Sequence, residues 1–217
     1  MALDRGVERP RGLPFEKVLA ELVTHAADIK DAPQSYRIEG DIDPAQLRPL
    51  VALPFETTIT EHQRHFILHT GTEYYMHSNP DPSINDREIT SQLWFHAHGT
   101  KFGVVFDAPS LFDLRTATIR SKNPRLSDPI IAHKDGLIVF SVRQQQFDAT
   151  IKEIGQWLEA HSALSDEESG PTEHSLRLES EMGRELAEKM GAIIFETTWE
   201  KKAGIERIRR TFNRAVE

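Results

Sequence analysis

Residues 91–114 read Ser-Gln-Leu-Trp-Phe-His-Ala-His-Gly-Thr-Lys-Phe-Gly-Val-Val-Phe-Asp-Ala-Pro-Ser-Leu-Phe-Asp-Leu, and they decide the fold. An apolar run leads directly into His96 and His98, and alternate residues of a strand face the same side, so both imidazoles can reach one point. Further on, residues 109–113 resemble the start of a helix, with Asp113 in its first turn. Two imidazoles and a carboxylate are three ligands that a catalytic zinc ion takes, which leaves the fourth position for water. The sequence therefore predicts a zinc site made of His96, His98 and Asp113.

The order of these residues resembles the motif of the JAB/MPN (JAMM) metallopeptidases. That motif is a distant Glu, then His-x-His, then Ser-x-x-Asp, which Ser110 and Asp113 match. The resemblance covers roughly residues 50–142. The chain departs from the family in two places: Gly99 stands where a Pro usually follows the second His, and eleven residues separate His98 from Ser110 where about seven are usual.

The resemblance implies a fold, an activity and roles for individual residues. The fold would be α/β (α+β), a mixed central sheet flanked by helices in the JAMM/cytidine-deaminase-like layout. Glu56 would be the general base and Ser110 would donate a hydrogen bond to the oxyanion. The implied function is zinc-dependent hydrolysis of a peptide or isopeptide bond in a protein substrate, including removal of a ubiquitin-like modifier from lysine. The alternative is a metal-free MPN-like scaffold in a larger assembly.

Other assignments of the motif residues remain open or are excluded by the sequence. Glu61 and Glu73 are rivals of Glu56 for the role of the base. A cupin places a Glu three or four residues after its His-x-His pair, and a metallo-β-lactamase-like site continues with x-Asp-His, but Thr100 and Lys101 follow here. No Gly-x-x-x-x-Gly-Lys-Ser/Thr loop is present, so the sequence lacks the P-loop of a nucleotide hydrolase.

Strands are expected on both sides of the motif. Residues 55–60 and 65–70 are rich in β-branched and aromatic residues, which indicates two strands joined by a turn at 61–64. Residues 89–98 are expected to be the strand that carries the histidine pair, and residues 110–120 a helix. Strands at 129–133 and 137–142 are joined by Lys-Asp-Gly, a strong hairpin signal. Residues 99–109 are interpreted as a short strand or a flap that borders the substrate channel.

The flanking regions complete the predicted domain organisation. Residues 1–50 are expected to form an N-terminal tail and helix, with the helix at 14–26, a strand at 36–38 and one helical turn at 45–50 that Pro49 stops. Residues 51–161 would be the JAMM-like catalytic domain, with a helix from 147 to 161. Residues 162–217 would be a C-terminal extension packed on it: an acidic linker, a helix (176–190) ended by Gly191, a strand (192–199) and a helix (204–216). This extension either continues the sheet or caps it.

Composition limits the class of protein. The chain has 217 residues, 38% hydrophobic and 28% charged, with a net charge of −8 and a pI near 5.7. This acidic balance disfavours a nucleic-acid partner, because binding phosphates needs a basic face. The absence of cysteine leaves any metal to histidine and carboxylate ligands. Neither a membrane span nor a secretory signal is expected, and the predicted location is the cytoplasm.

Overall fold

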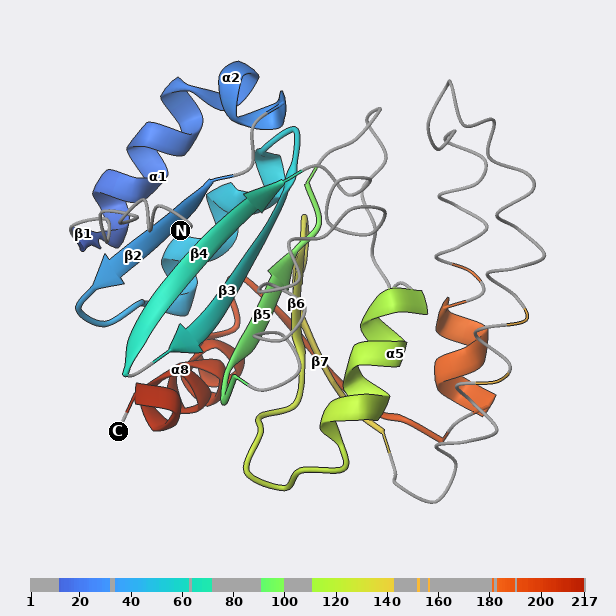
Figure 1. The fold of residues 1–217 in the computed structure, drawn as a ribbon. Coiled ribbons are helices and arrows are strands. Elements are labelled where there is room, and N and C mark those ends of the chain that lie inside the picture. Colours follow the sequence, from blue (N-terminus) through green and yellow to red (C-terminus); the bar gives the residue numbers. More distant parts are fainter. Residues whose placement is uncertain are drawn as a thin grey trace, which may run out of the picture.

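One mixed sheet organises the described part of the computed structural model, with the strand order β1-β2-β4-β3-β5-β6-β7-β8 (Figure 1). The structure describes residues 12–31, 34–62, 64–71, 91–99, 111–142, 152, 156, 181, 183–189 and 191–216. The mixed α/β architecture predicted from the sequence is confirmed. The strands are β1 (Leu13–Pro14), β2 (Ser35–Glu39), β3 (Glu56–His62), β4 (His65–Gly71), β5 (Trp94–Ala97), β6 (Ile130–His133), β7 (Gly136–Ser141) and β8 (Ile193–Thr198).

The centre of the sheet is the trio β4, β3 and β5. Strand β3 pairs antiparallel with both neighbours, so it has no free edge within the sheet. Strand β5 then pairs in parallel with β6, and β6 and β7 form the predicted hairpin around Lys134 and Asp135. Strand β8 extends the sheet beyond β7, which decides between the two expectations for the C-terminal third in favour of a continued sheet.

Helices cover both faces of the sheet (Figure 1). One face carries α1, α2, the 3-10 helix η1 and α8, and the other carries α5 and the helical residues 183–189. The bounds of the labelled helices are Phe15–Thr24 for α1, Ala26–Asp31 for α2, Pro44–Ala52 for η1, Leu111–Arg120 for α5 and Lys202–Val216 for α8.

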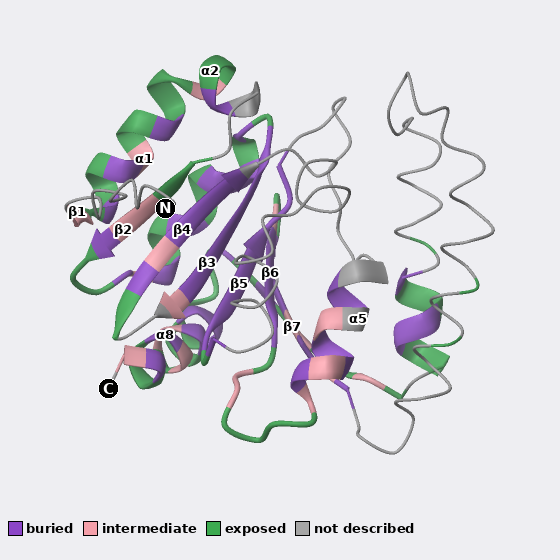
Figure 2. Cartoon of the chain, in the orientation of Figure 1, coloured by how far each residue is buried: buried purple, intermediate pink, exposed green. Residues whose placement is uncertain are grey.

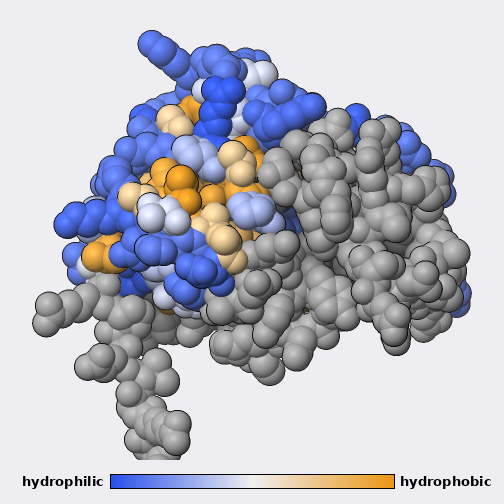
Figure 3. Space-filling model, turned by 90° about the horizontal axis from the view of Figure 1, so that it is seen from above, coloured by the Kyte–Doolittle hydropathy of each residue, from blue (hydrophilic) through white to orange (hydrophobic). Residues whose placement is uncertain are grey.

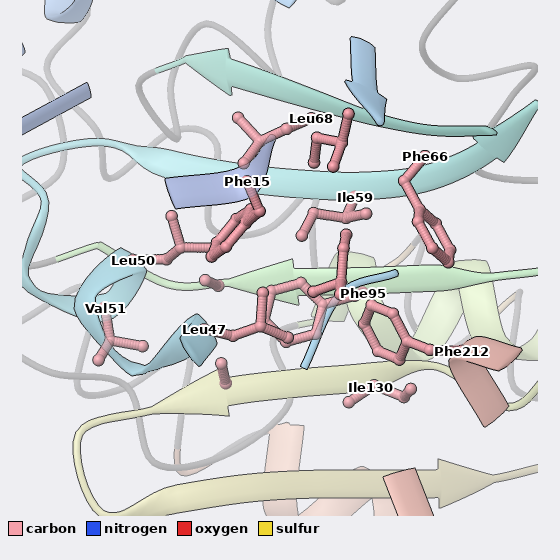
Figure 4. Close-up of a cluster of buried hydrophobic side chains, with 14 of the residues drawn as sticks. Phe15, Leu47, Leu50, Val51, Ile59, Phe66, Leu68, Phe95, Ile130 and Phe212 are labelled. Carbon is pink, nitrogen blue, oxygen red and sulfur yellow. The ribbon is translucent and has the colours of Figure 1, made fainter. Parts of the chain in front are cut away.

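The larger hydrophobic core lies on the face of α1, η1 and α8. Figure 4 shows side chains from the three central strands meeting those of η1 and α8, and the rings of Phe66 and Phe95 lie 5.6 and 6.0 Å from that of Phe212. Helix α8 is amphipathic, and its apolar face contributes three residues at helical spacing to this core: Ile205, Ile208 and Phe212. This core fixes β3 and β5 in register.

A smaller core lies on the opposite face, where α5 packs. Leu114 and Ala117 of α5 meet Ile131, Ile138 and neighbouring apolar residues of the sheet. Strand β5 is buried along its whole length and β3 from Glu56 to Thr60, as their purple in Figure 2 shows. Polar side chains on these strands are therefore held away from water, and they need partners inside the protein.

Some sequence-based boundaries need correction. Pro49 lies inside η1 and does not stop it, because Leu47, Leu50 and Val51 are buried in the core and outweigh the missing N–H of proline. Strand β3 continues to His62, so the turn is shorter than 61–64. Within the described residues, the strand carrying the histidine pair covers only Trp94–Ala97.

The segment before residue 50 is part of the same sheet. Strand β2 pairs antiparallel with β4, and β1 pairs in parallel with β2. The first helical stretch is two helices, since α1 ends at Thr24 and α2 begins at Ala26. Of the expected helix at 147–161, the structure describes Lys152 and Gln156, both helical, and the acidic linker lies outside the described residues.

The described surface is largely hydrophilic, with an apolar area on the face seen in Figure 3. The large apolar side chains that are exposed in the described residues are Val23, Ile193 and Ile194. Within the same residues, no helix has the length and apolar character that crossing a membrane requires.

Candidate metal centre

Two adjacent central strands bring Glu56 and the histidine pair together. The β3–β5 register pairs Thr58 with His96, and Glu56 lies two residues before Thr58, so its side chain leaves the sheet on the same face. His98 follows His96 by two residues and shares this face. One donor atom from each of Glu56, His96 and His98 lies within 4.8 Å of the others. We call these three residues the metal cluster, since the group could hold a metal ion.

The metal cluster is buried. Glu56 is 3% exposed, and His96 and His98 are each 2% exposed. A carboxylate removed from water carries a large free-energy cost unless it is paired or coordinates a metal. Concentrating one carboxylate and two imidazoles in the interior is therefore not expected of ordinary core packing.

Asp113 lies beside the metal cluster, in contact with His98. It lies in the first turn of α5 and is 2% exposed, and its Oδ2 is 3.1 Å from Nε2 of His98. The positive end of the helix dipole favours a carboxylate at this position. Of the three predicted ligands, the structure places His96 and His98 in the metal cluster, whereas Asp113 contacts His98 but is not part of that group. Glu56 takes the third place in the group, with its Oε2 3.5 Å from Nε2 of His96.

Thr58 contacts Nδ1 of His96, the ring nitrogen that does not face Glu56. Its Oγ1 is 3.0 Å from Nδ1 of His96, and both side chains are buried. When Nδ1 carries the ring proton, it donates to Thr58, which leaves the lone pair of Nε2 directed toward Glu56. The ring of Trp94 lies 5.8 Å from that of His96 and forms an apolar wall beside it. Sequence analysis missed Thr58, because only the strand register shows that it faces His96.

His69 on β4 is also buried, with 1% of its surface exposed. Its Nδ1 is 2.8 Å from Oγ of Ser35, and its Nε2 is 3.4 Å from Oγ1 of Thr60. Because β4 pairs His69 with Thr58, the buried polar groups form a row across the central strands on the face of the metal cluster.

Gly99 has a structural reason to differ from the proline of the JAMM motif. A Cβ atom at this position would lie 2.2 Å from the carbonyl oxygen of Phe55 and 2.6 Å from that of Leu53. Neither proline nor any other residue with a side chain fits without moving the backbone that precedes Glu56. The close approach holds the end of the histidine strand against the start of β3.

The remaining site candidates are placed as follows. Glu61 lies on β3 five residues after Glu56, so it faces the opposite side of the sheet, and its Oε1 accepts a hydrogen bond from the backbone N–H of Arg64. Ser110, Glu73 and residues 100–109 lie outside the described residues, so their predicted roles remain predictions.

The chain was compared with protein-family models, with curated proteins and with solved structures, and no match was found in any of the three comparisons.

Proposed function

We propose that this protein is a zinc-dependent hydrolase that cleaves a peptide or isopeptide bond. One observation carries the proposal: the buried metal cluster with Asp113 against His98, assembled on a sheet from residues far apart in the sequence. The resemblance of residues 50–142 to the JAMM motif supports the same activity.

The donor set fits zinc. The nitrogen and oxygen donors belong to the ligand types that zinc accepts, and the chain has no cysteine to offer. Two donors on one tetrahedral zinc lie about 3.3 Å apart, given bond lengths of about 2.0 Å. The separations of 3.1 Å for His98–Asp113 and 3.5 Å for His96–Glu56 lie near this value, so each carboxylate stands at ligand spacing from one histidine. Following the JAMM resemblance, we assign His96, His98 and Asp113 as the residues that would hold the ion and Glu56 as the base beside it.

Glu56 is then the acid–base residue of the reaction. A zinc ion at this site supplies Lewis acidity, which polarises a carbonyl group and lowers the pKa of a bound water to about 7. The carboxylate of Glu56 takes a proton from the attacking water as the new C–O bond forms. It returns that proton to the leaving amine as the C–N bond breaks. Burial of Glu56 keeps bulk water from competing for the proton.

The proposed substrate is a protein carrying an amide bond to lysine, as in a ubiquitin-like conjugate. This assignment follows from the JAMM resemblance, in which Ser110 donates to the oxyanion. Proteins of that type hydrolyse amide bonds and have no need of a redox or nucleotide cofactor, in keeping with the missing P-loop.

The test combines zinc content with turnover on three variants. We expect about one zinc per wild-type chain. Glu56→Gln is nearly isosteric and should keep the metal, but it cannot take a proton, so cleavage of a lysine-linked ubiquitin-like fusion should slow by about 10²–10⁴. Asp113→Asn should lose zinc. Glu61→Gln is the matched control, because it makes the same change on the same strand but on the opposite face, and both zinc content and turnover should be retained.

The outcomes separate the assigned roles. If Glu56→Gln loses zinc while Asp113→Asn retains it, Glu56 is a ligand and the base lies elsewhere. A wild-type protein that binds no zinc and cleaves no conjugate contradicts the enzyme and favours the metal-free scaffold.

A further inference from the structure

A groove lies at the end of the sheet remote from the metal cluster. It has a volume of about 600 Å³ and is lined by the loop after α5, by β7 and by α8. Gln92, just before β5, lines this groove, whereas His96 and His98 lie four and six residues further on, about 13 and 20 Å away at the rise per residue of a strand. Figure 1 shows the loop passing beneath the sheet from α5 to β6. The groove is thus separate from the metal cluster.

Arginine is the main charged residue type in the described lining of the groove. The described lining residues include four arginines, Arg120, Arg125, Arg207 and Arg214, one acidic residue, Asp128, and no lysine. The chain as a whole, by contrast, carries a net charge of −8. We call this region the arginine groove.

Arg120 supplies a fixed positive charge beneath the groove. It is 2% exposed, and its guanidinium donates to the carbonyl oxygens of Ser91, Gln92 and Ser127 at 2.9, 3.2 and 3.0 Å. These three bonds fix the position of the guanidinium, which stays protonated in proteins.

The other three arginines are available to a ligand. Arg207 is exposed, and its Cζ lies 4.1 Å from the ring centroid of Phe195, a stacking contact that limits its motion. Arg125 and Arg214 are exposed and form no ion pair with another described residue. Arg209 of the same helix differs, because it is engaged by Asp43 and Glu206.

Asp128 opposes this positive charge only in part. Burial raises the pKa of its carboxyl group, while a hydrogen bond from Ser141 and the charges of Arg120 and Arg207 lower it. Among the described lining residues, this one carboxylate faces four guanidinium groups.

We propose that the arginine groove binds a small anion that carries two or more phosphate groups. Guanidinium groups bind phosphate oxygens in bidentate fashion, and arginine is the cation that proteins favour where this geometry matters. The volume matches that of small-molecule sites, which are about 300–1,000 Å³. A groove of this size suits a compact ligand better than an extended acidic chain. The proposal does not depend on zinc or on the proposed hydrolysis.

The test is calorimetric titration with tripolyphosphate at fixed ionic strength. We expect one binding site per chain. The double variant Arg207→Gln/Arg214→Gln should weaken binding by about tenfold or more, as expected for the loss of charge-assisted hydrogen bonds. Arg207→Lys should also weaken binding, since lysine keeps the charge but not the bidentate geometry. Arg210→Gln is the matched control, because Arg210 is exposed on the same helix and does not line the groove, and its affinity should equal that of the wild type.

A His98→Ala variant separates this site from the metal cluster. It should bind tripolyphosphate as the wild type does, and circular dichroism of each variant verifies the fold. The proposal is overturned if tripolyphosphate does not bind, if Arg210→Gln weakens binding as much as the double variant, or if His98→Ala abolishes it. Citrate or polyglutamate that binds as tightly as tripolyphosphate also overturns the assignment to phosphate.

Discussion

The role proposed for Thr58 depends on one contact. Its hydroxyl is 3.0 Å from Nδ1 of His96, which puts it behind a proposed ligand. Partners of this kind orient a histidine ligand and fix its tautomer, and removing them typically lowers metal affinity by about 10–100-fold. With the ring proton held on Nδ1 by Thr58, Nε2 of His96 is the atom left to bind a metal.

We expect Thr58→Val to weaken zinc binding by about 10–100-fold, because valine keeps the shape of threonine but offers His96 no oxygen. Thr58→Ser keeps the oxygen and should restore most of the affinity. Competition against a chromophoric chelator measures the dissociation constant of each variant, and thermal unfolding of the metal-free proteins checks that the fold is intact. Equal zinc affinity for the Val and Ser variants would contradict the role of the hydroxyl.

The residues in and around the metal cluster differ in how readily the sequence alone could identify them. His96 and His98 could be found because their spacing repeats with the period of a strand, and Asp113 because it follows a helix start. Thr58 and the burial of His69 depend on which residues face each other across β3, β4 and β5. Register is a tertiary property, so a single strand does not encode it locally.

Among the elements, α5 is held in place by polar contacts at both of its ends. Asp113 in its first turn contacts His98, and Arg120 in its last turn donates to carbonyl oxygens before β5 and in the loop that follows α5. The helix therefore has the same partner at its two ends, the segment that carries the histidine pair. Tilting α5 would disturb both contacts.

We expect Arg120→Leu to lower the free energy of unfolding by about 3 kcal/mol or more, because it leaves buried carbonyl oxygens without a donor. Arg125→Leu is the control: Arg125 is exposed in the loop that follows α5, so the change should stay within about 0.5 kcal/mol. Urea unfolding measures both. If Arg120→Leu lowers the free energy of unfolding no more than the control does, the three carbonyl groups accept hydrogen bonds from water in the variant.

Element types were easier to predict than element ends. The hairpin of β6 and β7, the strand β8 and the helix α8 follow from turn signals and from the spacing of apolar residues. The positive φ of Gly191, 59°, agrees with its predicted place after a helix. Local propensity failed at Pro49, where burial of the neighbouring leucines determines the structure.

At the scale of the molecule, one polar contact joins the first quarter of the chain to its last helix. Asp43 caps η1 by accepting a hydrogen bond from the backbone N–H of Ala45, and its Oδ1 also lies 2.8 Å from a guanidinium nitrogen of Arg209 in α8. The hydrogen bond from Arg209 is the main reason that the pKa of Asp43 lies below its usual value of 3.8. A lowered pKa means that this carboxylate stabilises the fold above pH 3.8, and that the stabilisation is lost as the pH falls through the lower, folded-state pKa.

We expect Asp43→Asn to lower the free energy of unfolding at pH 6 by up to about 1 kcal/mol, the range of a partly exposed ion pair. Asparagine is as good a helix cap as aspartate, so the substitution isolates the charge. The difference between the two proteins should shrink toward zero as the pH falls below 3.8 and through the lowered, folded-state pKa of Asp43. Urea unfolding at a series of pH values measures it, and a pH-independent difference would assign the loss to packing.

The predicted division at residue 50 does not appear as a break in the sheet. Strands β1 and β2 extend the sheet on one side and β8 extends it on the other. Sequence analysis lacked a signal for this, because the pairing of β2 with β4 joins residues about thirty positions apart, and no local pattern records which strands are neighbours.

The position of Glu56 and His96 on two paired central strands limits how the length of this chain can vary. A residue inserted into β3 between Glu56 and Thr58 would move the carboxylate to the opposite face, among the phenylalanines, while leaving the composition of the strand almost unchanged. Insertions between the elements carry no such penalty, since the strands stay paired. Descendants of this sequence that keep the chemistry should therefore differ in length between their strands and scarcely within them.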